Sequence, residues 1–366
     1  MGKKTHPGGF LIMSNASSNF QNCQREQGFV LVLTLSVIAI TLLASSYIAN
    51  WINQEIENHS TLITSAQQTI DNYSTLSTII YISSTHPLTY SGIAFPDKVN
   101  DTYSLPFNEN GDPLLNMQGN ELRLDSRVYQ GIGDSQFQLQ DEAGLISVNT
   151  LTKERLVTLF AMAGINGVYA VPALAKLNDY IDKDSDYRLN GAERKQYLSS
   201  NREGPKNQRL RSPQELSAVL DWTSIMSKEQ FDKVSYLLTS SPIVSVNINT
   251  APKESLLLLG LSPYEVDQII TFRENQSINF ANIRSIIPST VNLPDTDIFQ
   301  YYASRYLRVN IQSAKFGKID EYHIKMTPRS TDGKPWHIRY KKTLFAPQIK
   351  QLNEPLPTGK AIFSDQ

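Results

Sequence analysis

The longest hydrophobic pattern lies near the N-terminus, where residues 29–54 include no charged side chain. At 1.5 Å per residue the stretch from Phe29 to Ile52 makes a helix of roughly 36 Å, enough to cross a hydrocarbon core of about 30 Å. Apolar residues then recur at helical spacing, with no Pro or Gly before Pro87: Ile52, Ile56, Ile63, Ile70, Leu76 and Ile80. The pattern predicts one long helix over residues 29–86, apolar first and amphipathic later.

Alternating apolar and polar positions predict an antiparallel sheet built from two parts of the chain. Within residues 87–148 the alternation gives a hairpin, Leu122–Tyr129 and Ser135–Gln140, after an irregular connection rich in Pro, Gly and Asn. Within residues 292–345 it gives three strands, Ala303–Gln312, Lys318–Met326 and His337–Leu344. The last segment, 346–366, contains three prolines and predicts a poorly ordered tail.

The residues between these two parts, 149–291, have helical spacing and contain an internal repeat. The run Asn149-Thr150-Leu151-Thr152-Lys153-Glu154 is echoed by Asn249-Thr250-Ala251-Pro252-Lys253-Glu254, and each leads into a leucine-rich segment. Threonine is a favoured N-cap, and an acid in the first turn complements the helix dipole. Thr150 and Thr250 therefore predict two helix starts.

The second copy continues as a helix-hairpin-helix pattern around Leu259-Gly260-Leu261-Ser262-Pro263. Related hairpins bind a DNA backbone through glycine amides, but this one lacks a second glycine and a neighbouring Lys or Arg. The whole chain is also balanced, with 34 Lys and Arg against 35 Asp and Glu. We interpret the hairpin as a packing unit and expect no nucleic-acid partner.

The sequence offers no constellation for catalysis. It has no Gly-x-Ser-x-Gly motif, P-loop, Cys-His pair or zinc-ligand spacing. Its single cysteine, Cys23, lies before the apolar stretch. We therefore expect no enzyme, and no disulfide or thiol chemistry in the folded part.

An acidic run matches the ligand spacing of an EF-hand loop, in which calcium takes oxygen ligands from six positions. Those positions are Asp182, Asp184, Asp186, Arg188 through its backbone carbonyl, Asn190 and Glu193. The carboxylates repel one another unless a cation lies among them. Tyr187 stands where the EF-hand requires Gly, so calcium binding would need another loop path. The alternative is a solvated acidic loop before a helix.

The N-terminus allows three interpretations. A cleaved secretory signal would end near Ala44-Ser45-Ser46, and a signal anchor would stay intact. In the third, residues 1–28 are a leader that is cut between Gly28 and Phe29, which leaves the apolar helix whole. The layout of Arg25, Gly28 and Phe29 resembles a type IV prepilin signal, in which Phe29 would be N-methylated.

Several motifs in order resemble the K-type minor pseudopilins of the type II secretion system, over a region from Arg25 to about Tyr340. They are the prepilin-like start with Leu33, Asp141–Thr150, Asn178–Asp184, Arg211–Leu216 and Val246–Ala251. The resemblance implies an α+β fold: a pilin-like long N-terminal helix packed on an antiparallel sheet, with a large all-α domain inserted into the sheet. That domain, over 149–291, would be SAM-like or helix-hairpin-helix-like and would contain calcium.

The resemblance also implies a role at the tip of the type II secretion pseudopilus, initiating assembly and assisting export of folded proteins across the outer membrane. Most pilins carry Glu at the fifth mature position, where it pairs with a neighbour's N-terminal ammonium. Here that position is Leu33, which suits a subunit with no neighbour above it. The alternatives are a minor pilin of a type IV pilus or DNA-uptake system, and a signal-anchored periplasmic interaction module.

The expected location is the inner membrane, crossed once. Lys3, Lys4 and Arg25 precede the apolar stretch and Glu55 and Glu57 follow it, so the N-terminus is cytoplasmic and the C-terminal domain periplasmic. The implied partners are other minor pseudopilins in a tip complex, the major pseudopilin, the prepilin peptidase and the inner-membrane assembly platform. Secreted substrates are further candidates, because basic residues gather in the C-terminal strands, although such a face also protects a sheet edge.

Overall fold

The computed structural model describes residues 26–94, 121–287, 298–313, 318–328, 330–331 and 333–345. Arg25 and Cys23, the connection over 95–120, Arg329 and the tail over 346–366 lie outside these residues. The chain divides into two compact units, Met1–Ala66 and Gln67–Gln366, and the division falls within the first helix.

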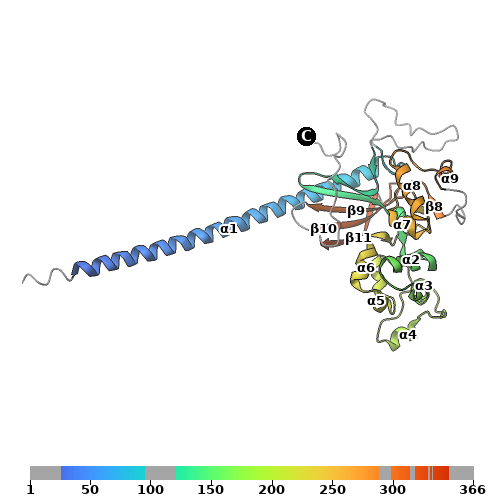
Figure 1. Cartoon of the computed structure of the whole chain (residues 1–366), viewed down its shortest axis with the longest axis horizontal. Coiled ribbons are helices and arrows are strands. Elements are labelled where there is room, and N and C mark those ends of the chain that lie inside the picture. Colours follow the sequence, from blue (N-terminus) through green and yellow to red (C-terminus); the bar gives the residue numbers. More distant parts are fainter. Residues whose placement is uncertain are drawn as a thin grey trace, which may run out of the picture. The chain divides into compact units, whose positions relative to one another are not determined.

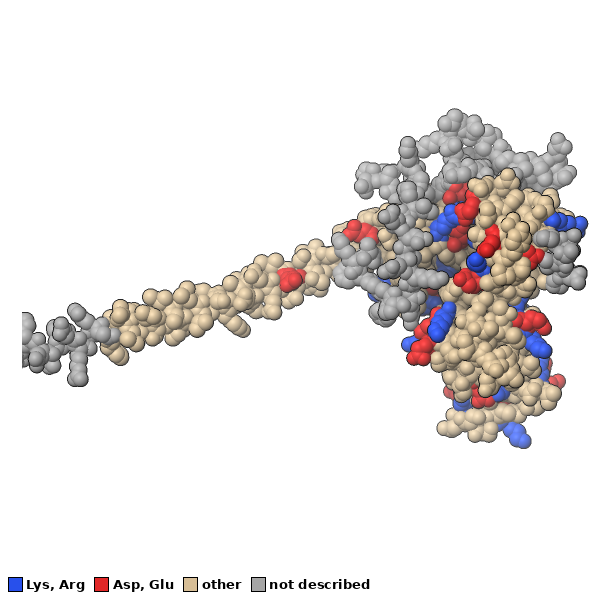
Figure 2. Space-filling model, in the orientation of Figure 1, with Lys and Arg blue, Asp and Glu red and all other residues tan. Residues whose placement is uncertain are grey.

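Helix α1 runs without interruption over Glu26–Thr85, which confirms the predicted long helix. In the first unit its apolar residues are exposed, including Phe29, Ile52, Ile56 and Ile63. Figure 2 shows the same segment as a surface almost free of charge. In the second unit the helix becomes buried at Leu76, Ile79, Ile80 and Ile82. Only the C-terminal end of the predicted apolar stripe therefore packs on the protein's own core.

A five-stranded antiparallel sheet has the order β11-β10-β9-β4-β3. Its strands are β3 (Asp125–Gln130), β4 (Ser135–Asp141), β9 (Tyr306–Ser313), β10 (Lys318–Met326) and β11 (Trp336–Phe345), close to the predicted runs. Along β9, Leu307, Val309 and Ile311 are buried and join the core that contains the end of α1. The residues between them belong to the opposite face because side chains alternate along a strand.

Helices α2 to α9 lie between β4 and β9 in the sequence, and these two strands pair directly, from Ser135 opposite Ser313 to Asp141 opposite Leu307. Figure 1 shows the helices grouped beside the sheet. They are α2 (Lys153–Met162), α3 (Ala170–Ile181), α4 (Arg194–Ser199), α5 (Trp222–Ile225), α6 (Lys228–Val234), α7 (Lys253–Leu258), α8 (Pro263–Arg273) and α9 (Ile283–Ile286). A separate hydrophobic core, extending from Ile146 to Phe299, holds them together.

Six further strands in the described residues are two residues long. β1 (Gly92–Ile93) pairs with β2 (Leu122–Arg123) antiparallel. The other two pairs are parallel: β5 (Ile146–Ser147) with β6 (Leu238–Thr239), and β7 (Val246–Asn247) with β8 (Phe299–Gln300). The members β5 and β7 directly precede the two Asn-Thr runs, so the repeat seen in the sequence is also a repeat of structure.

The two repeat asparagines hold distant segments in the same way. Asn149 Oδ1 accepts from the Leu210 N–H at 2.8 Å, and its Nδ2 donates to the Leu210 carbonyl at 3.0 Å. Asn249 Oδ1 accepts from the Ile278 N–H at 2.8 Å, and its Nδ2 donates to the Ile278 carbonyl at 2.8 Å. Each asparagine satisfies one residue's backbone donor and acceptor and so fixes a loop against the core.

The predicted caps are two residues too early. Thr152, not Thr150, is the N-cap of α2 and accepts from the Arg155 N–H at 3.3 Å. Helix α7 follows Pro252, which makes no side-chain cap. Thr250 instead donates to the buried carboxylate of Asp141 at 3.0 Å. Thr150 and Thr250 lie in the short turns that follow β5 and β7, so the helices α2 and α7 start later.

Candidate metal centre

The residues of the predicted leader cleavage lie in the first turns of α1. Gly28 is within the helix, and Phe29 and Leu33 are 71% and 53% exposed. Among the described residues, α1 is the one helix long and apolar enough to cross a membrane. The predicted cleavage point is therefore at the end of a candidate span.

The acidic loop connects α3 to α4. Helix α3 buries Ala173, Leu177 and Tyr180 and ends at Ile181, because Asp182 takes an extended backbone conformation as its C-cap. Helix α4 begins after Glu193, whose carboxylate forms a capping box with Gln196. Both ends of the loop are thus fixed by helices that pack in the core.

Three of the six predicted ligands come together. Carboxylate oxygens of Asp182, Asp184 and Glu193 all lie within 4.8 Å of one another. Glu193 is only 7% exposed. Its Oε1 and the Oδ1 of Asp182 are buried without a hydrogen-bond partner among the described residues. Burial raises the pKa of the Glu193 carboxyl, and the neighbouring acids raise it further. Such a group of oxygens fits a hard cation such as calcium.

The other three predicted ligands are exposed and are arranged differently. Asp186 is not in the group of three acids, and its N–H donates to Asp184 Oδ1 at 3.0 Å. Asn190 has a left-handed backbone, with φ of 64°. The Arg188 carbonyl, which we expected as a ligand, accepts from the Gly191 N–H at 2.8 Å. The Arg188 guanidinium bonds Asp179 at 2.7 Å and also contacts Asp182.

Asp179 is a residue of this site that sequence reasoning missed. It is fully buried near the end of α3, and its Oδ2 accepts from the backbone N–H groups of Arg188 at 3.3 Å and Ala192 at 2.9 Å. A Cβ at Gly191 would lie 1.9 Å from the same oxygen, so only glycine fits there. The signal was an acid on the buried face of α3.

A second cluster of titratable groups lies where the helical region meets the sheet. His323 on β10 is fully buried, with Nδ1 2.5 Å from Glu142 Oε1 and Nε2 2.6 Å from Glu321 Oε1. Arg339 bonds Glu142 at 3.2 Å, and Lys342 bonds Glu321 at 2.9 Å. The structure thus places His323 inside a charged network.

This network stabilises ionised carboxylates. Burial acts to raise the pKa of Glu142, but the hydrogen bond and charge of His323 outweigh it, so the pKa falls below its usual range. For Glu321 burial is again opposed, by Arg308 first and then His323, and the pKa is lowered strongly. The two imidazole nitrogens of His323 thus each face one of these carboxylates. The network joins the helical region to the sheet, and these residues form no open site.

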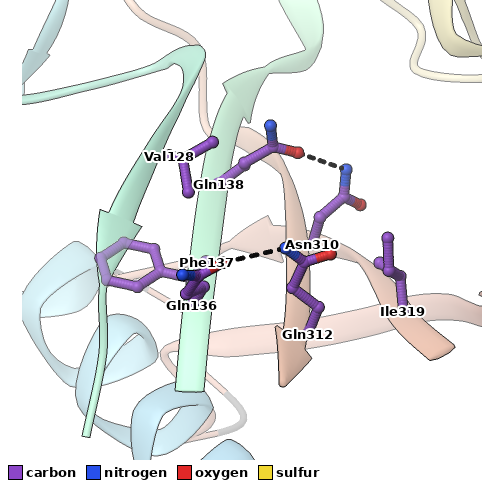
Figure 3. Close-up of a pocket in the computed structure, with 7 residues that line it drawn as sticks. All are labelled: Val128, Gln136, Phe137, Gln138, Asn310, Gln312 and Ile319. Atoms are coloured by element: carbon purple, nitrogen blue, oxygen red, sulfur yellow. Dashed lines mark hydrogen bonds between the residues drawn. The ribbon is translucent and has the colours of Figure 1, made fainter. Parts of the chain in front are cut away.

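One depression on the sheet is lined largely by amide side chains. It is formed by Val128, Gln136, Phe137, Gln138, Asn310, Gln312 and Ile319 (Figure 3). Asn310 Nδ2 donates to Gln138 Oε1 at 3.3 Å, and Gln312 Nε2 donates to Gln136 Oε1 at 3.0 Å, as the dashed lines show. These bonds join β4 to β9 from side chain to side chain. The residues include no titratable group, so we assign them a structural role.

Comparison with known proteins gives one family match. Residues 134–234 match the family model described as type II secretion system (T2SS), protein K. The matched region begins just before β4 and ends with α6, and it includes the acidic loop and Glu142. The family predicted from the sequence motifs is thereby confirmed over these residues. No curated protein matches the chain.

A solved structure is also similar to the chain. It is the crystal structure of the GspK-GspI-GspJ complex from the type 2 secretion system of enterotoxigenic Escherichia coli. The TM-score is 0.47 at 15% sequence identity, covering 80% of this chain and 98% of that chain.

Proposed function

The chain carries a domain of the type II secretion system protein K family, and we propose that it is a minor pseudopilin of such a system. The match of residues 134–234 is the observation that carries the proposal. The fold is then a pilin-like helix and sheet with the helical region, 149–291, as a SAM-like or helix-hairpin-helix-like insertion. For the other segments we propose the bounds that the sequence predicts. These are the leader over 1–28, the long helix over 29–86, the two parts of the sheet over 87–148 and 292–345, and the tail over 346–366.

Helix α1 supports a filament subunit. Its apolar side chains stay exposed beyond the length needed for a bilayer, at Leu62, Ile63 and Ile70. A long exposed apolar helix needs lipid or other helices around it. We propose that α1 crosses the inner membrane once, with its N-terminus in the cytoplasm, and later packs against the helices of other pseudopilins.

The proposed tip position rests on Leu33. A carboxylate within the bilayer is costly unless a partner neutralises it, and the partner in a filament is the ammonium of the next subunit. A subunit at the tip has no such neighbour, so leucine costs nothing there. In the solved complex named above GspK is bound with GspI and GspJ, and we propose that this chain binds two minor pseudopilins of these kinds.

Deletion of the gene in its host tests the function. We expect folded proteins destined for export to accumulate in the periplasm, and expression of the wild-type chain to restore their export. Normal export in the deletion strain would contradict the proposal. Loss of DNA uptake or of pilus-dependent movement, with export intact, would favour the type IV pilus alternative.

We also propose that Asp182, Asp184 and Glu193 hold calcium, with Asp186, Asn190 and the Arg188 carbonyl as further ligands after rearrangement of the loop. The bound ion would supply positive charge to oxygens that otherwise repel one another, and so would join the end of α3 to the start of α4. The proposal rests on the buried, unpartnered oxygens of Asp182 and Glu193.

Chelation tests the calcium site. We expect EDTA to lower the melting temperature of the purified full-length protein by about 2–8 °C, as loss of roughly 1–2 kcal/mol predicts for a domain of this size. Asp184→Ala should lower it similarly and remove the response to EDTA. Asp267→Ala, an exposed acid on α8, is the control and should keep the response. An unchanged melting temperature with EDTA would remove the claim.

A further inference from the structure

The acidic loop contains its own cation. Arg188, a residue of this loop, forms ion pairs with both Asp179 and Asp182. Asp179 is fully buried, whereas the Arg188 side chain is 44% exposed. The guanidinium therefore approaches the acids from the solvent side and stays within reach of water. An arginine with that access can leave one acid without being trapped in the interior.

Arg188 satisfies only part of the acidic group. It contacts one oxygen of Asp182, and the other oxygen, Oδ1, is buried without a partner, as is Glu193 Oε1. A monovalent, planar cation held from one side cannot reach these inner oxygens. A compact divalent ion can bind several carboxylates at flexible geometry. Asp182 is the acid that both cations would share.

We propose that Arg188 is a tethered competitor for the divalent cation of this loop. Its guanidinium neutralises Asp179 and Asp182 in the cation-free protein. When a divalent ion binds Asp182, Asp184 and Glu193, the guanidinium releases Asp182 and keeps its bond to Asp179. This inference rests on the proposed calcium site and adds a residue that sets its affinity.

The competition has a direct consequence for affinity. The Arg188 guanidinium and the divalent ion repel each other when both are near the Asp182 carboxylate. The ion must also displace the existing contact between Arg188 and Asp182. Arg188 thus weakens calcium binding while it keeps the cation-free loop folded. Weak sites of this kind are filled only where calcium is abundant, as outside the cytoplasm. Arg188 would therefore delay completion of the loop until the domain has left the cytoplasm.

Calcium titration of the full-length protein in detergent tests the role of Arg188, by calorimetry and by melting temperature. Arg188→Gln should bind calcium about tenfold more tightly than wild type, because it removes both the repulsion and the bond to be displaced. Without calcium it should melt at a lower temperature, since Asp179 is left buried without its cation. Lys183→Gln removes the same charge from an exposed position in the same loop and should change the affinity by less than about threefold.

Other variants separate the two proposals. If wild type binds calcium, Asp184→Asn does not, and Arg188→Gln binds no more tightly than wild type, the competitor role is wrong and the calcium site stands. If neither wild type nor Arg188→Gln binds calcium, both are wrong. Should Arg188→Gln fail to fold, Arg188→Lys replaces it, since lysine keeps the charge but cannot bond two acids in one plane. An affinity equal to or below that of wild type would then contradict the inference.

Discussion

Glu321 is a residue of the sheet whose surroundings stabilise its ionised form. Its carboxylate is buried beside Arg308, His323 and Lys342, which lower its pKa despite the burial. A carboxyl whose pKa is lowered on folding stabilises the protein above its unfolded pKa of about 4.3, and this contribution is lost as the pH falls. Glu142 acts in the same direction.

We therefore expect the free energy of unfolding to decrease as the pH is lowered from 7 to about 3. Glu321→Gln should be less stable than wild type by about 3 kcal/mol at pH 7, because buried cations lose their partner, and should lose less on acidification. Urea unfolding at each pH measures both quantities. Glu229→Gln, at an exposed position of α6, serves as control. If Glu321→Gln had the same pH slope as wild type, the network would not hold ionised carboxylates.

Other residues show where sequence reasoning stopped. The spacing of Asp182, Asp184 and Glu193 identified the acids that come together, since these residues are neighbours along one loop. The spacing predicted Arg188 as a calcium ligand through its backbone carbonyl, whereas in the structure the Arg188 guanidinium forms an ion pair with Asp179. Spacing fixes which residues share a loop but leaves side-chain rotamers open, so the ion pair to Asp179 could not be foreseen.

At the scale of elements, the period of the hydrophobic pattern was sufficient for α1 and for the strands of the five-stranded sheet, but not for the two-residue strand pairs. The pairing of β4 with β9 was not a local property, because the whole helical region separates them in sequence. The repeat of Asn149 and Asn249 was visible in the sequence, but their partners Leu210 and Ile278 follow no motif. Contacts of this kind depend on how the helices pack.

The two asparagines give a matched test of the repeat. Asn249 is fully buried and also donates to the Tyr301 carbonyl at 3.1 Å, whereas Asn149 is half-buried. Unpaired buried backbone groups cost about 1–3 kcal/mol each. We expect Asn249→Ala to lower the free energy of unfolding by about 3 kcal/mol and Asn149→Ala by about half as much. Denaturant unfolding measures both.

The exposed Asn275→Ala is the control for these two variants and should change the stability by less than about 0.5 kcal/mol. Equal and small losses for Asn149→Ala and Asn249→Ala would mean that water replaces the side-chain amides. The repeat would then be a similarity of sequence without a shared structural purpose.

At the scale of the whole molecule, the chain combines an uninterrupted apolar helix with a region, residues 134–234, that matches the protein K family model. A secretory signal cut near Ala44-Ser45-Ser46 would remove most of the apolar part of α1, and an intact anchor would retain the leader. A pseudopilin must lose the leader and keep the helix. The position of the mature N-terminus therefore separates the three interpretations of the sequence.

Mass spectrometry of the N-terminal peptide, from protein purified out of its host's membranes, is the most direct test of the account. We predict a mature chain that begins at N-methylated Phe29, and a Gly28→Ala variant that keeps its leader and does not restore export. A wild-type chain with an intact leader, or one that begins near residue 47, would contradict the assignment as a pseudopilin.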